Sequence, residues 1–339
     1  MSHFTMTKSN YSTYYNVLEK MRDVFISLGY TVERFNENYP NGTTVQRGHR
    51  LHVKKGNVYI AMAGASNLNP TWTLGTDTWG TNQIKGIVVQ IQTVSRAEDD
   101  RWWNSSTDNQ LSTCQLGENS DCWFFVKDDS FLFCNRFTST RYQFINLLKQ
   151  KGFDTTKEYI CMGTGTAGNP GTYTSAYGSS FSVFPFIFNG SYASANSSDA
   201  TTYIYNSLNL DREIVVPNFG STNSGASQSR TSLNYGRPGS ATGIISKTKT
   251  PFSERFTPLP IHISTVVSAG PSSGLKKRFQ LPNVYLILMD TYTPEETFLI
   301  GTDQFIALPF FEKSNTNLYT EVFCYNMGVA IKIGEGVNV

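Results

Sequence analysis

Charge is scarce in this chain. Only 16 % of its 339 residues are Asp, Glu, Lys or Arg, and the formal net charge is +2. A nucleic-acid surface needs a long basic stripe, whereas the one basic run, Lys276-Lys277-Arg278, is a triplet typical of a solvated turn before a strand. The charge balance therefore argues against direct binding of nucleic acid or of an anionic membrane surface.

Long apolar runs are also missing. No segment approaches the ~18 apolar residues that span a bilayer. The opening residues, MSHFTMTKSNYS, lack the apolar centre of a secretory signal. We therefore expect no membrane segment, and a soluble protein made in a reducing compartment.

The cysteines are few and are not spaced for a metal or a disulfide framework. Their number is odd, no two form a Cys-x-x-Cys pair, and their spacing fits no common zinc site. Most stand in apolar, strand-like runs, which predicts buried free thiols. A Cys114–Cys122 disulfide stays open as the local alternative, and we expect no metal and no cofactor. The five cysteines are Cys114, Cys122, Cys134, Cys161 and Cys324.

Aromatic and small polar residues fill the place of the missing charges. Aromatic residues make up 14 % of the chain, whereas a disordered protein has few aromatics and a high net charge. The chain is therefore expected to fold. An aromatic surface with little charge is typical of a protein that packs against copies of itself or against neighbours.

Residues 1–155 are predicted to form an α/β domain of two helices on an antiparallel meander. The first helix covers residues 12–28, where apolar residues recur at helical spacing. The second is predicted at Ser139–Lys151 from apolar residues three positions apart. The predicted strands are Tyr30–Phe35, Leu51–Lys54, Val58–Ala63, Ile87–Thr93 and a hairpin of Trp123–Val126 with Phe131–Asn135.

Residues 156–339 are predicted to form a β-rich, sandwich-like domain with long polar loops. The Ser/Asn/Gly-rich segment 218–250 is too long for an ordinary connection, and we expect an arm that becomes ordered against a neighbour. The two parts together give an α+β fold class. The predicted strands are Tyr159–Met162, Ile261–Val267, Asn283–Met289, Phe298–Ile300, Phe305–Leu308, Tyr319–Tyr325 and Val329–Ile333.

Motifs that would carry catalysis are weak. Gly163-x-Gly165-x-x-Gly168 matches the dinucleotide pattern, but Asn169-Pro170-Gly171 follows where a helix would have to begin. His49 and His52 are three residues apart on a predicted strand and so point to opposite faces. We expect solvent-facing or interface histidines there. No catalytic residue is assigned.

Acidic, basic and indole side chains are most concentrated in the run Glu98-Asp99-Asp100-Arg101-Trp102-Trp103. Carbohydrate sites combine carboxylates with Trp faces, and protein interfaces use Trp and Arg as anchors. Adjacent indoles on an extended segment point to opposite sides, so they do not form one stacking platform. Arg101, Trp102 and Trp103 are therefore the candidate interface residues.

Three stretches together resemble virion proteins of tailed bacteriophages. The first is the opening helix with Leu28-Gly29-Tyr30, and the second is the hairpin from Cys122 to Leu132 with Tyr142-Gln143-Phe144. The third is the ending from Ile306-Ala307-Leu308-Pro309 to Tyr325-Asn326-Met327-Gly328 and Lys332. The resemblance covers about half of the chain, and it brings no catalytic residues with it.

The resemblance implies a structural role in the neck, tail or baseplate of a virion assembled in the host cytoplasm. The partners would be copies of the chain in a homo-oligomeric ring, and other virion proteins. One alternative is a receptor- or glycan-binding tail protein that uses Trp102 and Trp103. Another is a glycan hydrolase, which would need two carboxylates brought together by the fold at about 5–9 Å.

Overall fold

The computed structural model describes residues 3–11, 14–36, 50–65, 86–92, 94–98, 112–116, 120–136, 142–164, 166–167, 202–206, 212–215, 258–266, 275–309 and 327–335. These residues form mostly antiparallel β-sheet with one α-helix, α1 (Tyr14–Ser27). The β-rich character predicted for the chain is thereby confirmed. The predicted arm at 218–250 and the predicted strand Tyr319–Tyr325 lie outside these ranges.

The strands make two sheets. The six-stranded sheet has the order β11 (Thr166–Ala167), β6 (Ser112–Gln115), β5 (Gly86–Gln92), β4 (Val58–Ala65), β3 (Arg50–Lys55), β2 (Thr31–Asn36). The twelve-stranded sheet has the order β1 (Thr5–Tyr11), β7 (Ser120–Lys127), β8 (Ser130–Arg136), β9 (Tyr142–Lys151), β10 (Glu158–Thr164), β12 (Thr202–Asn206), β13 (Arg212–Val215), β14 (Leu259–Val266), β15 (Leu275–Leu288), β18 (Met327–Glu335), β17 (Asp303–Pro309), β16 (Thr297–Ile300). A short 3-10 helix, η4 (Met289–Thr291), follows β15.

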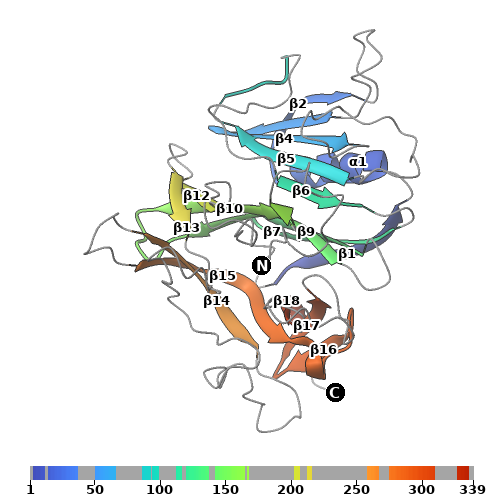
Figure 1. The fold of residues 1–339 in the computed structure, drawn as a ribbon, viewed down its shortest axis with the longest axis vertical. Helices are drawn as coiled ribbons and strands as arrows, with labels where there is room; N and C mark the ends of the chain where they lie inside the picture. The colour runs from blue at the N-terminus through green and yellow to red at the C-terminus, as the bar shows by residue number, and fades with distance from the viewer. Residues whose placement is uncertain are drawn as a thin grey trace, which may run out of the picture.

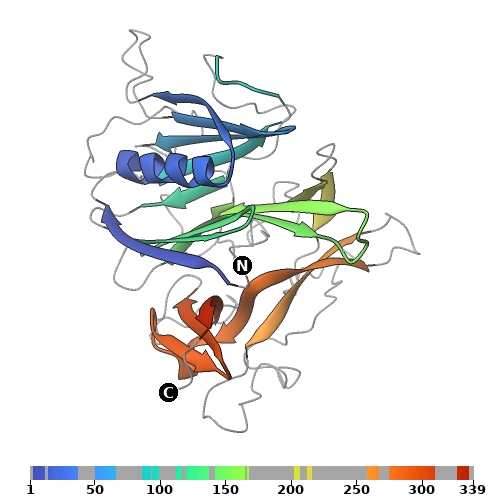
Figure 2. The same cartoon turned by 180° about the vertical axis from the view of Figure 1, so that it is seen from behind.

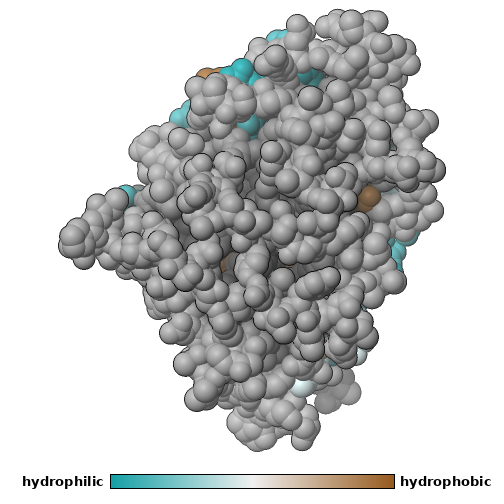
Figure 3. Space-filling view, in the orientation of Figure 1, coloured by the Kyte–Doolittle hydropathy of each residue, from teal (hydrophilic) through white to brown (hydrophobic). Residues whose placement is uncertain are grey.

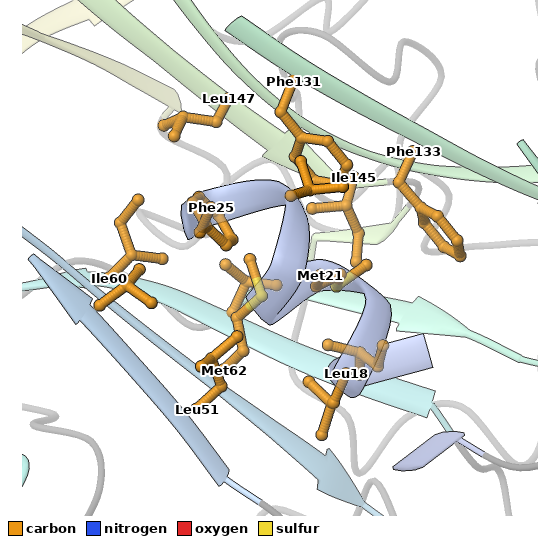
Figure 4. Close-up of a cluster of buried hydrophobic side chains, with 14 of the residues drawn as sticks. Leu18, Met21, Phe25, Leu51, Ile60, Met62, Phe131, Phe133, Ile145 and Leu147 are labelled. Carbon is orange, nitrogen blue, oxygen red and sulfur yellow. The ribbon is translucent and has the colours of Figure 1, made fainter. Parts of the chain in front are cut away.

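The helix predicted over residues 12–28 is confirmed as α1. Its apolar stripe is buried between the six-stranded sheet and strands β7–β10, and Phe25 is fully buried there (Figure 4). Gly29 ends the helix with a φ of 79°, a conformation that costs glycine little. The Lys55 amine donates to the carbonyl oxygen of Leu28 at 2.6 Å, which places a cation at the negative end of the helix.

The helix predicted at Ser139–Lys151 is wrong, because Tyr142–Lys151 forms strand β9. This strand has a hydrophobic core on each face: Phe144 and Leu148 lie in one core, and Ile145 and Leu147 lie in the other. A strand that is buried on both faces loses the apolar/polar alternation of an exposed strand. The remaining apolar residues, three positions apart, then imitate a helix.

Strands β7–β10 form the middle of three layers (Figures 1 and 2). Helix α1 and the six-stranded sheet cover one face, and β14, β15, β17 and β18 cover the other. The twelve-stranded sheet contributes to two of the layers, since it passes from β10 to β14 through the short strands β12 and β13. The β9–β10 pairing joins strands on either side of residue 155.

The predicted strands of the second half that fall in the described ranges are confirmed as β10, β14, β15, β16, β17 and β18. Strand β15 begins earlier than predicted, at Leu275. It therefore includes Lys276-Lys277-Arg278, which corrects the interpretation of this triplet as a turn. Two of these residues pair with β14, where Lys276 lies opposite Thr265 and Lys277 opposite Ser264.

Candidate functional site

The predicted interface residues Arg101, Trp102 and Trp103 lie outside the residues that the structure describes. The candidate site in the described part of the chain is a group of charged side chains between the middle layer and the C-terminal strands. We call it the Arg136 cluster. It consists of Lys8, Asp121, Arg136, Tyr142 and Glu295, which come from β1, β7, β8, β9 and the segment before β16.

Strand register brings three of these side chains together. Asp121 lies opposite Arg136 in the β7–β8 pair, and Arg136 lies opposite Tyr142 in the β8–β9 pair. Directly opposed residues of antiparallel strands project to the same face, with Cβ atoms about 5 Å apart. Three adjacent strands, β7, β8 and β9, thus carry an acid, a base and a phenol in one row.

Glu295 reaches this row from the C-terminal half of the chain, 159 residues after Arg136. Its backbone has a φ of 69°, which is uncommon for a residue other than glycine. Two backbone bonds hold the turn against β17: Glu295 N donates to Ala307 O at 2.7 Å, and Ala307 N donates to Glu296 O at 3.0 Å. Nothing in the local sequence indicates this placement, because it depends on a long-range contact.

The Arg136 guanidinium group forms ion pairs with both carboxylates, Asp121 and Glu295. The Tyr142 hydroxyl donates to Glu295 Oε1 at 2.6 Å. The Lys8 amine lies 3.5 Å from Asp121 Oδ2 and 3.6 Å from Glu295 Oε2. The cluster therefore fastens β1 and the C-terminal strands to the middle layer.

The electrostatics favour an ionised Asp121. Burial opposes its charge, but the hydrogen bond from Asn10 and the cations Lys8 and Arg136 together hold its pKa below the usual value. Burial, and then the hydrogen bond to Glu295, raise the pKa of Tyr142. The site thus places two carboxylates between two cations, as an ion-pair clamp does.

The two carboxylates lie near the same amine, so Asp121 Oδ2 and Glu295 Oε2 are at most about 7 Å apart, below the upper limit of about 9 Å for the carboxylate pair of a glycan hydrolase. A general acid must hold a proton at working pH, so the surroundings that lower the pKa of Asp121 disfavour that role for Asp121. Trp123, beneath the Lys8 amine, is fully buried and presents no face for a sugar to stack on.

A second polar group lies on the face of the six-stranded sheet opposite α1. Arg50, His52, Gln90 and Gln92 are all buried there. Arg34 and Arg50 both donate to the carbonyl oxygen of Ala97, and the Arg50 bond is 3.0 Å long. These bonds tie the segment after β5 to the sheet.

The expectation of a solvent-facing or interface histidine is wrong for His52, which is only 2 % exposed. His49, its predicted neighbour on the other face, lies outside the described ranges. Burial, and then the positive charge of Arg34, lower the pKa of His52 to about 4. The imidazole is therefore neutral at physiological pH, and it packs as a polar residue inside the sheet layer.

The side chains of Cys114, Cys122 and Cys134 are described, and all three are free and buried. The free-thiol interpretation is confirmed for these three, and the alternative Cys114–Cys122 disulfide is not formed. Burial is the main cause that raises the pKa of each thiol. Buried thiols of raised pKa react slowly, because the thiolate is the nucleophile.

We accordingly expect these thiols to be unreactive towards thiol reagents in the folded protein. A thiol reagent should modify Cys114, Cys122 and Cys134 only after a denaturant is added, and about five thiols should then be counted, as the five cysteines of the sequence require. The measurement is absorbance after reaction with an aromatic disulfide, with peptide mapping to assign the sites. Fast modification of Cys122 in the native protein would contradict the buried placement.

Within the described ranges, no three His, Cys, Asp or Glu side chains are grouped so that they could hold a metal ion. No helix in this part of the chain is both long and apolar enough to cross a membrane. A comparison with protein-family models finds no match, and a search of curated proteins also finds none.

Proposed function

We propose that the chain is a structural component of a tailed-bacteriophage virion, in the neck or tail region. It acts by forming a homo-oligomeric ring and by contacting other virion proteins. The protein is assembled in the host cytoplasm and resides in the particle. The resemblance of its three sequence stretches to virion proteins suggests the particle, and the sheet edges suggest how copies meet.

The observation that carries the proposal is the edge of the twelve-stranded sheet at β16. Among the described strands, β16 pairs with β17 alone and is the last strand of its sheet. Its residue Leu299 is 57 % exposed. An edge strand with an exposed apolar residue is a ready site for pairing with another chain.

The second end of the molecule also offers an edge. Strand β2 is the last strand of the six-stranded sheet, and it lies at the opposite end of the long axis from β16 (Figure 1). Contacts between different surfaces at opposite ends of a subunit generate rings when the rotation closes. We also propose that the fold has a two-part α+β layout, with a helix-bearing N-terminal part and a sandwich-like C-terminal part.

Mass spectrometry of purified particles tests the virion assignment. The chain should be present at many copies per particle, in a fixed ratio to other structural proteins. Its absence from particles would contradict the proposal. If particles contain it but lose only host attachment when Trp102 and Trp103 are changed to Ala, the receptor- or glycan-binding alternative takes its place.

Leu299 gives a direct test of the edge contact. We expect Leu299→Lys to weaken self-association by about tenfold or more, because it places a charge where an apolar contact is needed. The matched control is Ile26→Lys on α1, a residue that is similarly exposed at 53 %. Sedimentation of both variants at several concentrations provides the measurement, and equal association of the two would contradict the role of β16.

Exposed apolar side chains in the described part are few. In the view of Figure 3 the brown positions are few and separate from one another. The exposed large hydrophobic residues are Ile26, Val94, Phe153 and Leu299. Scattered single residues of this kind are normal on a protein surface, so the position of Leu299 on an edge strand distinguishes it from Ile26 on the helix.

A further inference from the structure

Strand β1 is held at the edge of its sheet by backbone pairing and by a buried residue just before it. It is the first strand of the twelve-stranded sheet and pairs with β7 over seven residues, from Thr5 opposite Val126 to Tyr11 opposite Ser120. None of the residues of β1 itself is fully buried. The fully buried residue is Phe4, just before the strand, whose ring meets the Phe125 ring edge-on.

The strand also touches the C-terminal layer, so it bridges two layers (Figure 2). Phe4 N donates to the carbonyl oxygen of Lys332 in β18 at 3.0 Å. Lys8 reaches Glu295 of the C-terminal half as well as Asp121 of β7. The place that β1 occupies therefore has three parts: the backbone edge of β7, a pocket for an aromatic ring, and a pair of carboxylates that accepts a cation.

We propose that β1 is exchanged between copies of this chain: in the assembled protein, β1 of one copy pairs with β7 of a neighbouring copy. The inference rests on the proposed assembly function and names the strand that links the subunits. The partner is a second copy because the site fits the sequence of β1 itself. Phe4 fills the aromatic pocket, and Lys8 meets the carboxylates of Asp121 and Glu295.

Exchange conserves the contacts of the folded chain. Each copy gives one β1 and receives one, so the seven residue pairs with β7 and the Lys8 ion pairs form again between neighbours. Exchange of an identical element is a low-cost route to an oligomer. β1 is an edge strand without a fully buried side chain, so it can leave its own copy without breaking up a core of its own side chains.

An engineered disulfide between residue 9 and the native Cys122 tests the exchange. Ser9 lies directly opposite Cys122 in the β1–β7 pair. Opposed residues have Cβ atoms about 4.5–5.5 Å apart, close to the range that a disulfide bridges. The assembled full-length Ser9→Cys protein is oxidised and then analysed by denaturing electrophoresis without reductant. The control carries Ser9→Cys together with Cys122→Ala, which removes the partner thiol.

Exchange predicts covalent dimers and longer chains, linked from residue 9 to residue 122, with more than half of the cross-linked protein in these species. Intramolecular links in a protein that sediments as an oligomer would overturn exchange and leave the assembly function standing. A protein that sediments only as a monomer would overturn both.

A second measurement needs no substitution. Unlabelled and ¹⁵N-labelled wild-type chains are assembled together and treated with a carbodiimide, which joins amines to nearby carboxylates. The Lys8 amine lies 3.5 Å from Asp121 Oδ2. Exchange predicts that about half of the peptides joined at these two residues combine one light and one heavy chain. Peptides of a single isotope alone, from an oligomeric protein, would overturn the proposal.

Discussion

Phe25→Ala should destabilise the protein by about 3–5 kcal/mol, the usual cost of removing a buried phenyl ring and leaving a cavity. Phe25 is fully buried on α1. Its ring lies 5.1 Å from the Tyr30 ring and 5.7 Å from the Phe131 ring, so the ring joins the helix, the six-stranded sheet and the middle layer. Urea unfolding followed by circular dichroism gives the free energy of unfolding.

The adjacent residue provides the control for Phe25. Ile26 is 53 % exposed on the same helix, and surface substitutions of this kind usually change stability by no more than about 0.5 kcal/mol. Ile26→Ala should therefore unfold near the wild-type midpoint. If Phe25→Ala and Ile26→Ala cost the same, α1 does not pack between the two sheets as described.

The second large effect is a loss of stability on acidification, caused by His52. The pKa of His52 is lowered from 6.5 to about 4 in the folded protein. Below pH 6.5 His52 binds a proton in the unfolded chain but not in the folded protein. The free energy of unfolding therefore falls until the pH reaches the folded-state pKa. At about 1.4 kcal/mol per pH unit, the loss between pH 6.5 and pH 4 is about 3 kcal/mol.

His52→Gln isolates this contribution, because glutamine is polar and does not titrate. The free energies of unfolding of wild type and variant are compared from pH 7 to pH 4. The carboxylates titrate in both proteins, so their effects cancel in the difference. The wild type should lose about 3 kcal/mol relative to the variant across this range. Parallel pH curves would contradict the buried, neutral imidazole.

Local sequence signals predicted helix α1 and the turn between β7 and β8. Helix α1 has an apolar stripe and a glycine stop, and both are visible in residues 12–28. The turn between β7 and β8 was also predictable, since polar residues separate two apolar runs there. In the structure, Asp128 adopts a φ of 47° in this turn. In these places local propensity and tertiary packing favour the same structure.

The sequence was misleading where packing overrides local pattern. Strand β9 is covered on both faces, so its residues carry no alternation that would identify a strand. Strand β1 was missed for the opposite reason: its side chains are mostly polar and exposed, and what holds it is backbone pairing with β7. Neither arrangement leaves a periodic apolar signal.

No local sequence signal predicts the Arg136 cluster. Arg136 and Glu295 are far apart in the chain, and each stands in an ordinary polar context. Their contact depends on how β17 holds the turn before β16 against the middle layer. The carboxylates that meet in the fold are Asp121 and Glu295, and no sequence motif joins these two residues.

Sedimentation equilibrium of the purified full-length protein tests the central claim, that this chain functions by assembling with copies of itself. The account predicts one dominant closed species at a fixed integer multiple of 37.9 kDa, with a size that does not grow as the protein concentration rises. A 37.9 kDa monomer at every concentration would contradict it.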